Sequence, residues 1–211
     1  FDLARRYFPV NTLILNDTVG ASFHEFRGKY SGYYLNIKDL LSRGVPIDEI
    51  GMQCHLGDRG GENVYNGERL YNVLDTYASL GRPINISEIS IPSVIEGEKD
   101  EDLQALAAEQ LYKICLSHPA LSGITWWNLT DDGVLIDGSY NEKPAYKALH
   151  RLIHDEWTTN ETLTTSTGSV RFRGFYGKYE ITVRTPEKTV TKKIHLSKEL
   201  SRIRRIDLSE N

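Results

Sequence analysis

The chain has 211 residues, 39% of them hydrophobic, and a formal net charge of −4, so it is long enough to bury one good core. Acidic and basic residues are mixed along it, which argues against nucleic acid as the main partner, because nucleic-acid-binding proteins favour a basic face. No apolar run approaches the ~20 residues that a membrane span needs, so a membrane partner is not expected either.

Up to residue 156, short apolar segments alternate with segments of helical spacing. The expected strands are 12–15, 50–55, 82–91 and 123–129. The expected helices are 1–8, 33–43, 68–80, 101–117 and 144–155. Because the chain opens inside a helix-like segment without Met, its start is expected to be internal. Strands that alternate with helices predict right-handed crossovers and a parallel sheet, and four such units make half of an eight-unit barrel.

The character of the sequence changes after Trp157. A polar, Thr-rich linker is followed by segments with period-2 alternation. These segments are 170–172, 179–183, 190–196 and 203–208. They predict a small antiparallel β appendage, so the expected domains are residues 1–156 and 157–211.

The segment 82–91 is the centre of the functional interpretation. If its strand is regular, Ile84, Ile86, Glu88 and Ser90 share one face. A strand that is apolar at its beginning and acidic at its end suits an active site on a parallel barrel, where the strand C-termini carry the chemistry. The alternative is a Glu that simply leaves the sheet into solvent.

Other polar or aromatic residues also stand where the predicted strands end. They are Asn16, Asp17, Gln53, His55, Glu88, Trp127 and Asn128. In a parallel sheet all strand C-termini lie on one side, so these residues are expected to converge. A carboxylate, an imidazole, an amide and a tryptophan suit carbohydrate, which offers hydroxyl groups and C–H faces. No cofactor is expected, and no His, Cys or Asp spacing predicts a metal site.

Four motifs, in this order, carry a resemblance to a known family: GVPIDEIGMQCHL, RPINISEISI, GITWWNLTD and KPAYKAL. They resemble the C-terminal half of family 10 glycoside hydrolases, the retaining endo-β-1,4-xylanases. The preceding ARRYFPVNTLILND is similar to helix 4 and strand 5 of that family. The resemblance covers about residues 1–152 and implies an α/β fold, the second half of a TIM (β/α)8 barrel (strands 5–8). The tail resembles the C-terminal β extension of plant-type members.

The resemblance implies a xylan-type polysaccharide as substrate, a secreted protein, and a role for each matching residue. Glu88 matches the nucleophile and His55 the histidine that hydrogen-bonds it, a donor that favours the ionised carboxylate. Gln53 matches the residue beside the acid/base position, and Trp127 lines the sugar site. Asn16 and Asp17 match the loop near the aglycone side. Two alternatives stay open: His55 as a core histidine, and a core position for one of the two adjacent tryptophans, 126 and 127.

Three departures from the family pattern limit the expected activity. The acid/base Glu of the family ends strand 4, which would precede Phe1. Ser90 stands where the family usually has Asp. The family usually has a second Trp after the motif GITWWNLTD, and the segment DDGVLIDGSY has none. The chain is therefore expected to carry the nucleophile but not the acid/base, and to be inactive by itself. The alternatives are a non-catalytic carbohydrate-binding or scaffold half-barrel, and another retaining β-glycosidase.

A half-barrel also leaves two open sheet edges and an inner face, expected to be apolar. We expect a cover for them. It would be the missing N-terminal half-barrel in a partner chain or a second copy of this chain, or the chain would have been trimmed after folding.

Overall fold

The computed structural model describes residues 1–18, 23, 25–56, 66–95, 98–129 and 134–197. Contacts divide the chain into two compact units, Phe1–His150 and Arg151–Asn211. This division falls inside the predicted helix 144–155, which is split into α5 (Pro144–His150) and a π-helical segment, η1 (Arg151–Glu156). The domain boundary predicted at 156/157 stays a prediction.

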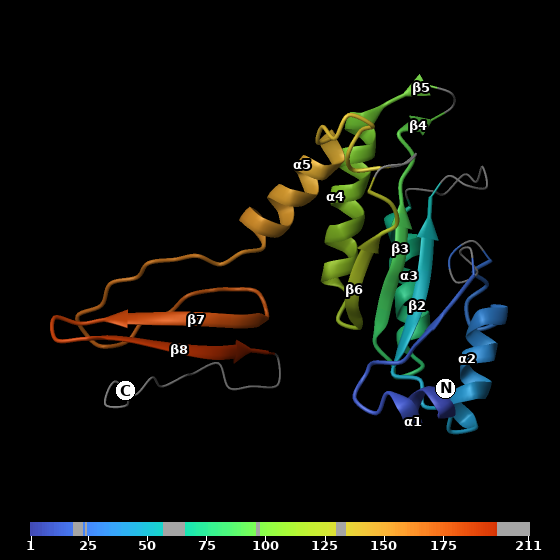
Figure 1. Cartoon of the computed structure of the whole chain (residues 1–211), viewed down its shortest axis with the longest axis horizontal. Helices are drawn as coiled ribbons and strands as arrows, with labels where there is room; N and C mark the ends of the chain where they lie inside the picture. The colour runs from blue at the N-terminus through green and yellow to red at the C-terminus, as the bar shows by residue number, and fades with distance from the viewer. Residues whose placement is uncertain (19–22, 24, 57–65, 96–97, 130–133, 198–211) are drawn as a thin grey trace. The chain divides into compact units, whose positions relative to one another are not determined.

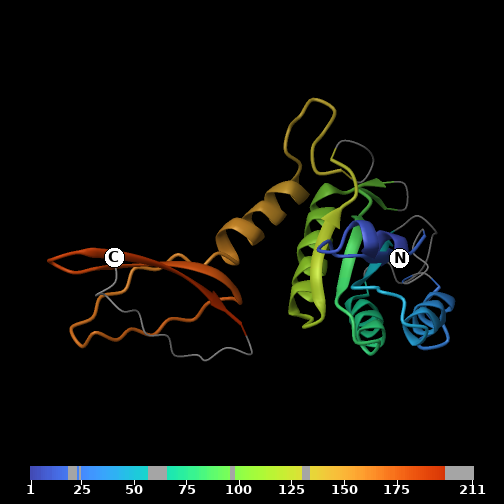
Figure 2. The same ribbon diagram turned by 60° about the horizontal axis from the view of Figure 1, so that its bottom comes forward.

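The first unit contains a four-stranded parallel sheet in the order β1-β2-β3-β6. The strands are β1 (Ile14–Asn16), β2 (Glu49–His55), β3 (Ile84–Ser90) and β6 (Leu121–Trp126). The helices are α1 (Asp2–Tyr7), α2 (Gly32–Ser42), α3 (Gly67–Ala78), α4 (Glu101–Ser117) and α5. Figures 1 and 2 show α2, α3 and α4 along one side of this sheet. The predicted alternation of parallel strands and helices is confirmed.

The helix α4 shows how local sequence sets an element. It spans the predicted residues 101–117, and the Asp100 carboxylate caps it by accepting a hydrogen bond from the Leu103 N–H at 2.8 Å. In α3 the apolar residues at helical spacing are buried, with Val73 and Leu74 at 1% and 0% exposure. An element that was not predicted, a short hairpin of β4 (Val94–Ile95) and β5 (Glu98–Lys99), lies between β3 and α4.

The strand β3 is not regular, so the predicted shared face of Ile84, Ile86, Glu88 and Ser90 is wrong. Met52 pairs with Ile86, but the next residue of β2, Gln53, pairs with Glu88. Ser87 is thus an extra residue, a β-bulge, and a bulge reverses the parity of the positions that follow it. Four isoleucines, Ile84, Ile86, Ile89 and Ile91, are consequently all 1% exposed or less. Glu88 is left on the other face of the sheet.

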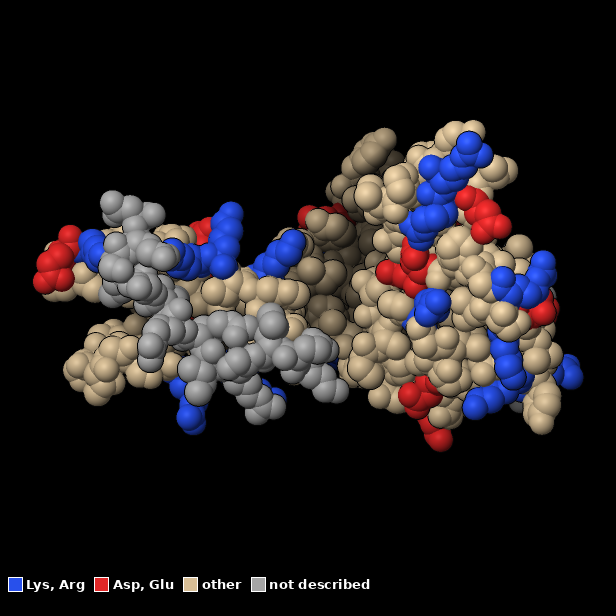
Figure 3. Space-filling view, turned by 90° about the horizontal axis from the view of Figure 1, so that it is seen from below, with Lys and Arg blue, Asp and Glu red and all other residues tan. Residues whose placement is uncertain are grey.

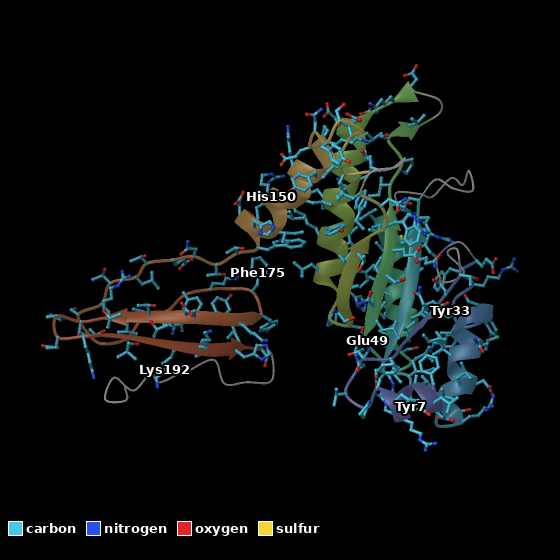
Figure 4. All side chains as sticks on the ribbon, in the orientation of Figure 1. Tyr7, Tyr33, Glu49, His150, Phe175 and Lys192 are labelled. Carbon is cyan, nitrogen blue, oxygen red and sulfur yellow. The ribbon has the colours of Figure 1, made fainter. Side chains whose placement is uncertain are left out.

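That other face of the sheet, opposite the helices, is polar, so the predicted apolar inner face is also wrong. The Ser87 hydroxyl donates to Asn16 Oδ1 at 2.6 Å, and the Ser122 hydroxyl donates to Glu49 Oε2 at 2.9 Å. Figure 4 shows Glu49 near the lower end of the sheet, where β2 begins. The physical reason is that the isoleucines of β3 all face the helices, which leaves small and polar side chains for the opposite face.

The second unit is built on an antiparallel hairpin of β7 (Gly177–Arg184) and β8 (Thr189–Leu196), which agrees with the predicted strands 179–183 and 190–196. Residues 170–172 form no strand, and the predicted strand 203–208 lies outside the described residues. The Tyr179 hydroxyl donates to the Phe175 carbonyl at 2.6 Å, and its ring lies 5.7 Å from that of Phe172. Backbone and ring contacts of this kind hold the extended segment against the hairpin.

Candidate functional site

Glu88 is the centre of a hydrogen-bonded group at the C-terminal ends of β2 and β3. Its Oε2 lies 3.0 Å from His55 Nε2, and its Oε1 accepts from the Gln53 side-chain amide at 3.2 Å. The side chains of His55 and Glu88 are 11% and 17% exposed. An ionised carboxylate only accepts hydrogen bonds, so two N–H donors from one strand fix its plane and leave its remaining lone pairs available.

The His55 ring is held at both nitrogens. Its Nδ1 lies 2.8 Å from the Ser90 hydroxyl oxygen, while its Nε2 faces Glu88. The Trp127 ring stands edge-on to the imidazole, with centroids 5.8 Å apart, and is itself 52% exposed. The Trp127 backbone N–H donates to the Ile89 carbonyl at 2.9 Å, which continues the β3–β6 pairing past the end of β6. An exposed aromatic ring beside a clamped carboxylate is a surface on which a sugar ring packs well.

The two predicted residues after β1 lie in different environments. Asp17 is 5% exposed, and its Oδ1 accepts from the Gln53 backbone N–H at 2.7 Å. It therefore anchors β2 at the point where the bulge of β3 occurs. Asn16 is exposed and accepts the hydroxyl of Ser87, the bulged residue next to Glu88. The substrate-binding roles predicted for Asn16 and Asp17 stay predictions.

The structure adds Tyr33, on α2, which the sequence did not single out (Figure 4). Its hydroxyl donates to the Leu15 carbonyl at 2.7 Å and to the Gly51 carbonyl at 3.0 Å. Burial, with the Asp17 charge as the second cause, raises the pKa of the Tyr33 phenol far above its usual range. The phenol therefore stays protonated and links β1 to β2. A helix residue with this role has no sequence signal, since its apolar spacing is that of any core tyrosine.

Among the residues that the structure describes, the surface and the remaining polar groups indicate no other centre of chemistry. Within the described ranges, no group of three or more His, Cys, Asp and Glu side chains is arranged to hold a metal ion. An open hollow of about 520 Å³ is lined by Glu25, Arg27, Tyr30 and their neighbours, and Glu88 is not among its lining residues. On the face drawn in Figure 3, Lys and Arg side chains of the first unit are interspersed with Asp and Glu. None of the described helices is both long and apolar enough to cross a membrane.

Comparison with known proteins decides the family. The family model of glycosyl hydrolase family 10 matches residues 1–152. The chain belongs to glycosyl hydrolase family 10. This family 10 chain is 32% identical over 168 residues to endo-1,4-beta-xylanase B of Thermotoga neapolitana, a match that covers 72% of the chain and 46% of the relative. It is also 32% identical over 157 residues to the anti-sigma-I factor RsgI6 of Acetivibrio thermocellus, covering 71% of the chain and 19% of that protein.

A solved structure extends the likeness to the fold. It is the crystal structure of xylanase 10B from Thermotoga petrophila RKU-1 in complex with xylobiose. The two chains are 31% identical and superpose with a TM-score of 0.60, and the match covers 74% of this chain and 50% of that one. The parallel sheet and its helices are thus those of the TIM-barrel fold of this family. The chain spans less than half the length of these two curated relatives.

Proposed function

We propose that this chain is the strand 5–8 half of a retaining endo-β-1,4-xylanase-type barrel and that Glu88 is its nucleophile. The observation that carries the proposal is the carboxylate clamp, in which His55 and Gln53 each donate to one oxygen of Glu88 at the C-terminal ends of two parallel strands. Xylan is the proposed substrate because one relative is an endo-1,4-beta-xylanase and a structural neighbour was solved with xylobiose.

The proposed reaction has two steps. A Glu88 carboxylate oxygen attacks the anomeric carbon, the glycosidic C–O bond breaks, and the leaving oxygen takes a proton from a second carboxyl group. Water then hydrolyses the ester that Glu88 has formed, and the second carboxyl acts as the base. In a retaining enzyme the two carboxyls stand about 5–5.5 Å apart. We assign the second carboxyl to the complementary half-barrel, which would also cover the polar face of the sheet.

The role of Glu88 is tested by trapping the ester. The chain is fused behind the first half of a family 10 barrel and treated with a 2-deoxy-2-fluoro-xylobioside that has a good leaving group. The peptide that contains Glu88 is expected to gain the mass of the fluoro-sugar, and Glu88→Gln is expected to abolish labelling. Glu49→Gln is the matched control. Glu49 lies at the opposite end of β2 from His55, and its carboxylate accepts a hydrogen bond from Ser122 and has no contact with Glu88 among those described. A label on a different carboxyl group would refute the assignment.

The isolated chain is expected to release no reducing sugar from xylan, because a retaining mechanism needs both carboxyls. If the isolated chain turned over xylan as fast as the fused protein, the second catalytic carboxyl could not lie in the complementary half-barrel. The assay uses the 211-residue chain, with its Glu88→Gln variant as the background.

A second candidate function is carbohydrate binding without catalysis. It is favoured by one specific observation: a relative that is 32% identical to this chain is an anti-sigma factor. The two functions separate in the labelling experiment. Retention on insoluble xylan without a covalent label favours the binding module, whereas labelling at Glu88 favours the enzyme.

A further inference from the structure

A single imidazole ring connects two side chains of β3. His55 pairs with Ser90 in the register of β2 and β3, and Glu88 stands two residues before Ser90 on the same strand. The His55 Nδ1 lies 2.8 Å from Ser90 Oγ, and its Nε2 lies 3.0 Å from Glu88 Oε2. The bulge at Ser87 makes this arrangement possible, because it shifts the register so that Glu88 pairs with Gln53 and Ser90 pairs with His55.

We propose that Ser90 is a positioning residue: its hydroxyl donates to His55 Nδ1 and so holds the ring in the tautomer that carries its proton on Nε2. Neutral imidazole has one donor and one acceptor nitrogen. The carboxylate of Glu88 offers only acceptors and so favours a proton on Nε2, and a Ser90 hydroxyl that donates to Nδ1 favours the same tautomer. The hydroxyl of Ser90 can rotate so that it donates to Nδ1.

Packing alone does not select this orientation. The Trp127 ring meets the imidazole edge-on at 5.8 Å, but an imidazole turned over by 180° has almost the same outline. In the turned ring, carbon atoms would face the Glu88 and Ser90 oxygens. The hydrogen bonds at Nδ1 and Nε2 together therefore distinguish the two orientations, and Ser90 supplies the partner at Nδ1. The consequence for catalysis, which rests on the proposed function, is that Nε2 presents its N–H to Glu88 Oε2 and holds the carboxylate in one orientation for attack.

The tautomer is measured directly in the full chain by nitrogen-15 NMR of labelled histidine, and a His55→Gln variant assigns the signals. The unaltered chain is expected to show a protonated Nε2 and an unprotonated Nδ1. Ser90→Ala is expected to shift the Nδ1 signal and mix the tautomers, and Ser90→Thr, which keeps the hydroxyl, is expected to restore the original pattern. A protonated Nδ1 in the unaltered chain, or identical spectra for Ser90→Ala, would overturn the proposal.

His118 supplies an internal reference for folding. Its Nδ1 accepts the Ala120 backbone N–H at 3.2 Å and its Nε2 lies 3.2 Å from Asp75 Oδ1, so its tautomer is set by groups other than Ser90. The His118 signals are expected to stay unchanged in both Ser90 variants. A Ser90→Ala spectrum in which the His55 and His118 signals change together would show a general disturbance, and the positioning role would be rejected.

Kinetics separate this inference from the proposed function. In the fused protein, Ser90→Ala is expected to lower kcat about 5- to 10-fold with little change in KM, the loss of one ordinary hydrogen bond in the transition state, and Ser90→Thr is expected to restore it. If the fused protein hydrolyses no xylan but the spectra are as expected, the proposed function fails and the positioning role of Ser90 stands. If xylan is hydrolysed and kcat is unchanged in Ser90→Ala, the positioning role fails and the proposed function stands.

Discussion

The bulge in β3 makes a prediction that a regular strand does not. Ile89 is 1% exposed and faces the helices, the same side as Ile86, because Ser87 is the extra residue between them. Ile89→Ala removes three carbon atoms, worth about 2.4 kcal/mol at about 0.8 kcal/mol each. The cavity left behind adds to this, so we expect a loss of about 3–4 kcal/mol in the free energy of unfolding. In a chain of this size that lowers Tm by roughly 10 °C.

The assay is urea unfolding followed by tryptophan fluorescence, with Ile86→Ala as the matched control, since Ile86 is also 1% exposed. The two variants are expected to lose similar free energy at unchanged m-value. In a regular strand, residue 89 would share the polar face with Asn85 and Ser87 and its truncation would cost little. A loss below about 1 kcal/mol for Ile89→Ala beside a full loss for Ile86→Ala would therefore refute the bulge.

Three further changes test other parts of the first unit. The Leu13 backbone N–H and the Arg5 guanidinium lower the pKa of Asp48, so the carboxylate stabilises the fold above the unfolded pKa of about 3.9 and loses this contribution as the pH falls through its folded pKa. Asp48→Asn is expected to flatten the dependence of the free energy of unfolding on pH in that acid range, and an unchanged dependence would refute this. Asp100→Ala removes the cap of α4 and is expected to lower the free energy of unfolding in urea by about 1 kcal/mol. An unchanged free energy of unfolding would show that the cap does not stabilise the chain. Burial raises the pKa of the Cys115 thiol to about 12, so this thiol is expected to react with a disulfide reagent only after unfolding, and rapid reaction of the native chain would contradict its burial.

Sequence patterns predicted well wherever the information is local. The helix 101–117 is marked by the spacing of its own apolar residues, and the structure agrees to the residue. Period-2 alternation likewise predicted β7 and β8, but it failed at 170–172, where an equally alternating segment forms no strand. Strand formation depends on a partner for the backbone, and alternation does not show whether one is present.

By itself, the sequence determined the family, the order of strands and helices, and the residues that gather at the C-terminal ends of the strands. Those properties follow from spacing and from motifs along the chain. Only the tertiary structure decided which face each residue of β3 occupies and that Ser90 meets His55, because the bulge arises from pairing between strands far apart in sequence. The side chains around the extra residue Ser87 have ordinary strand propensities, so nothing local distinguishes a bulged strand from a regular one.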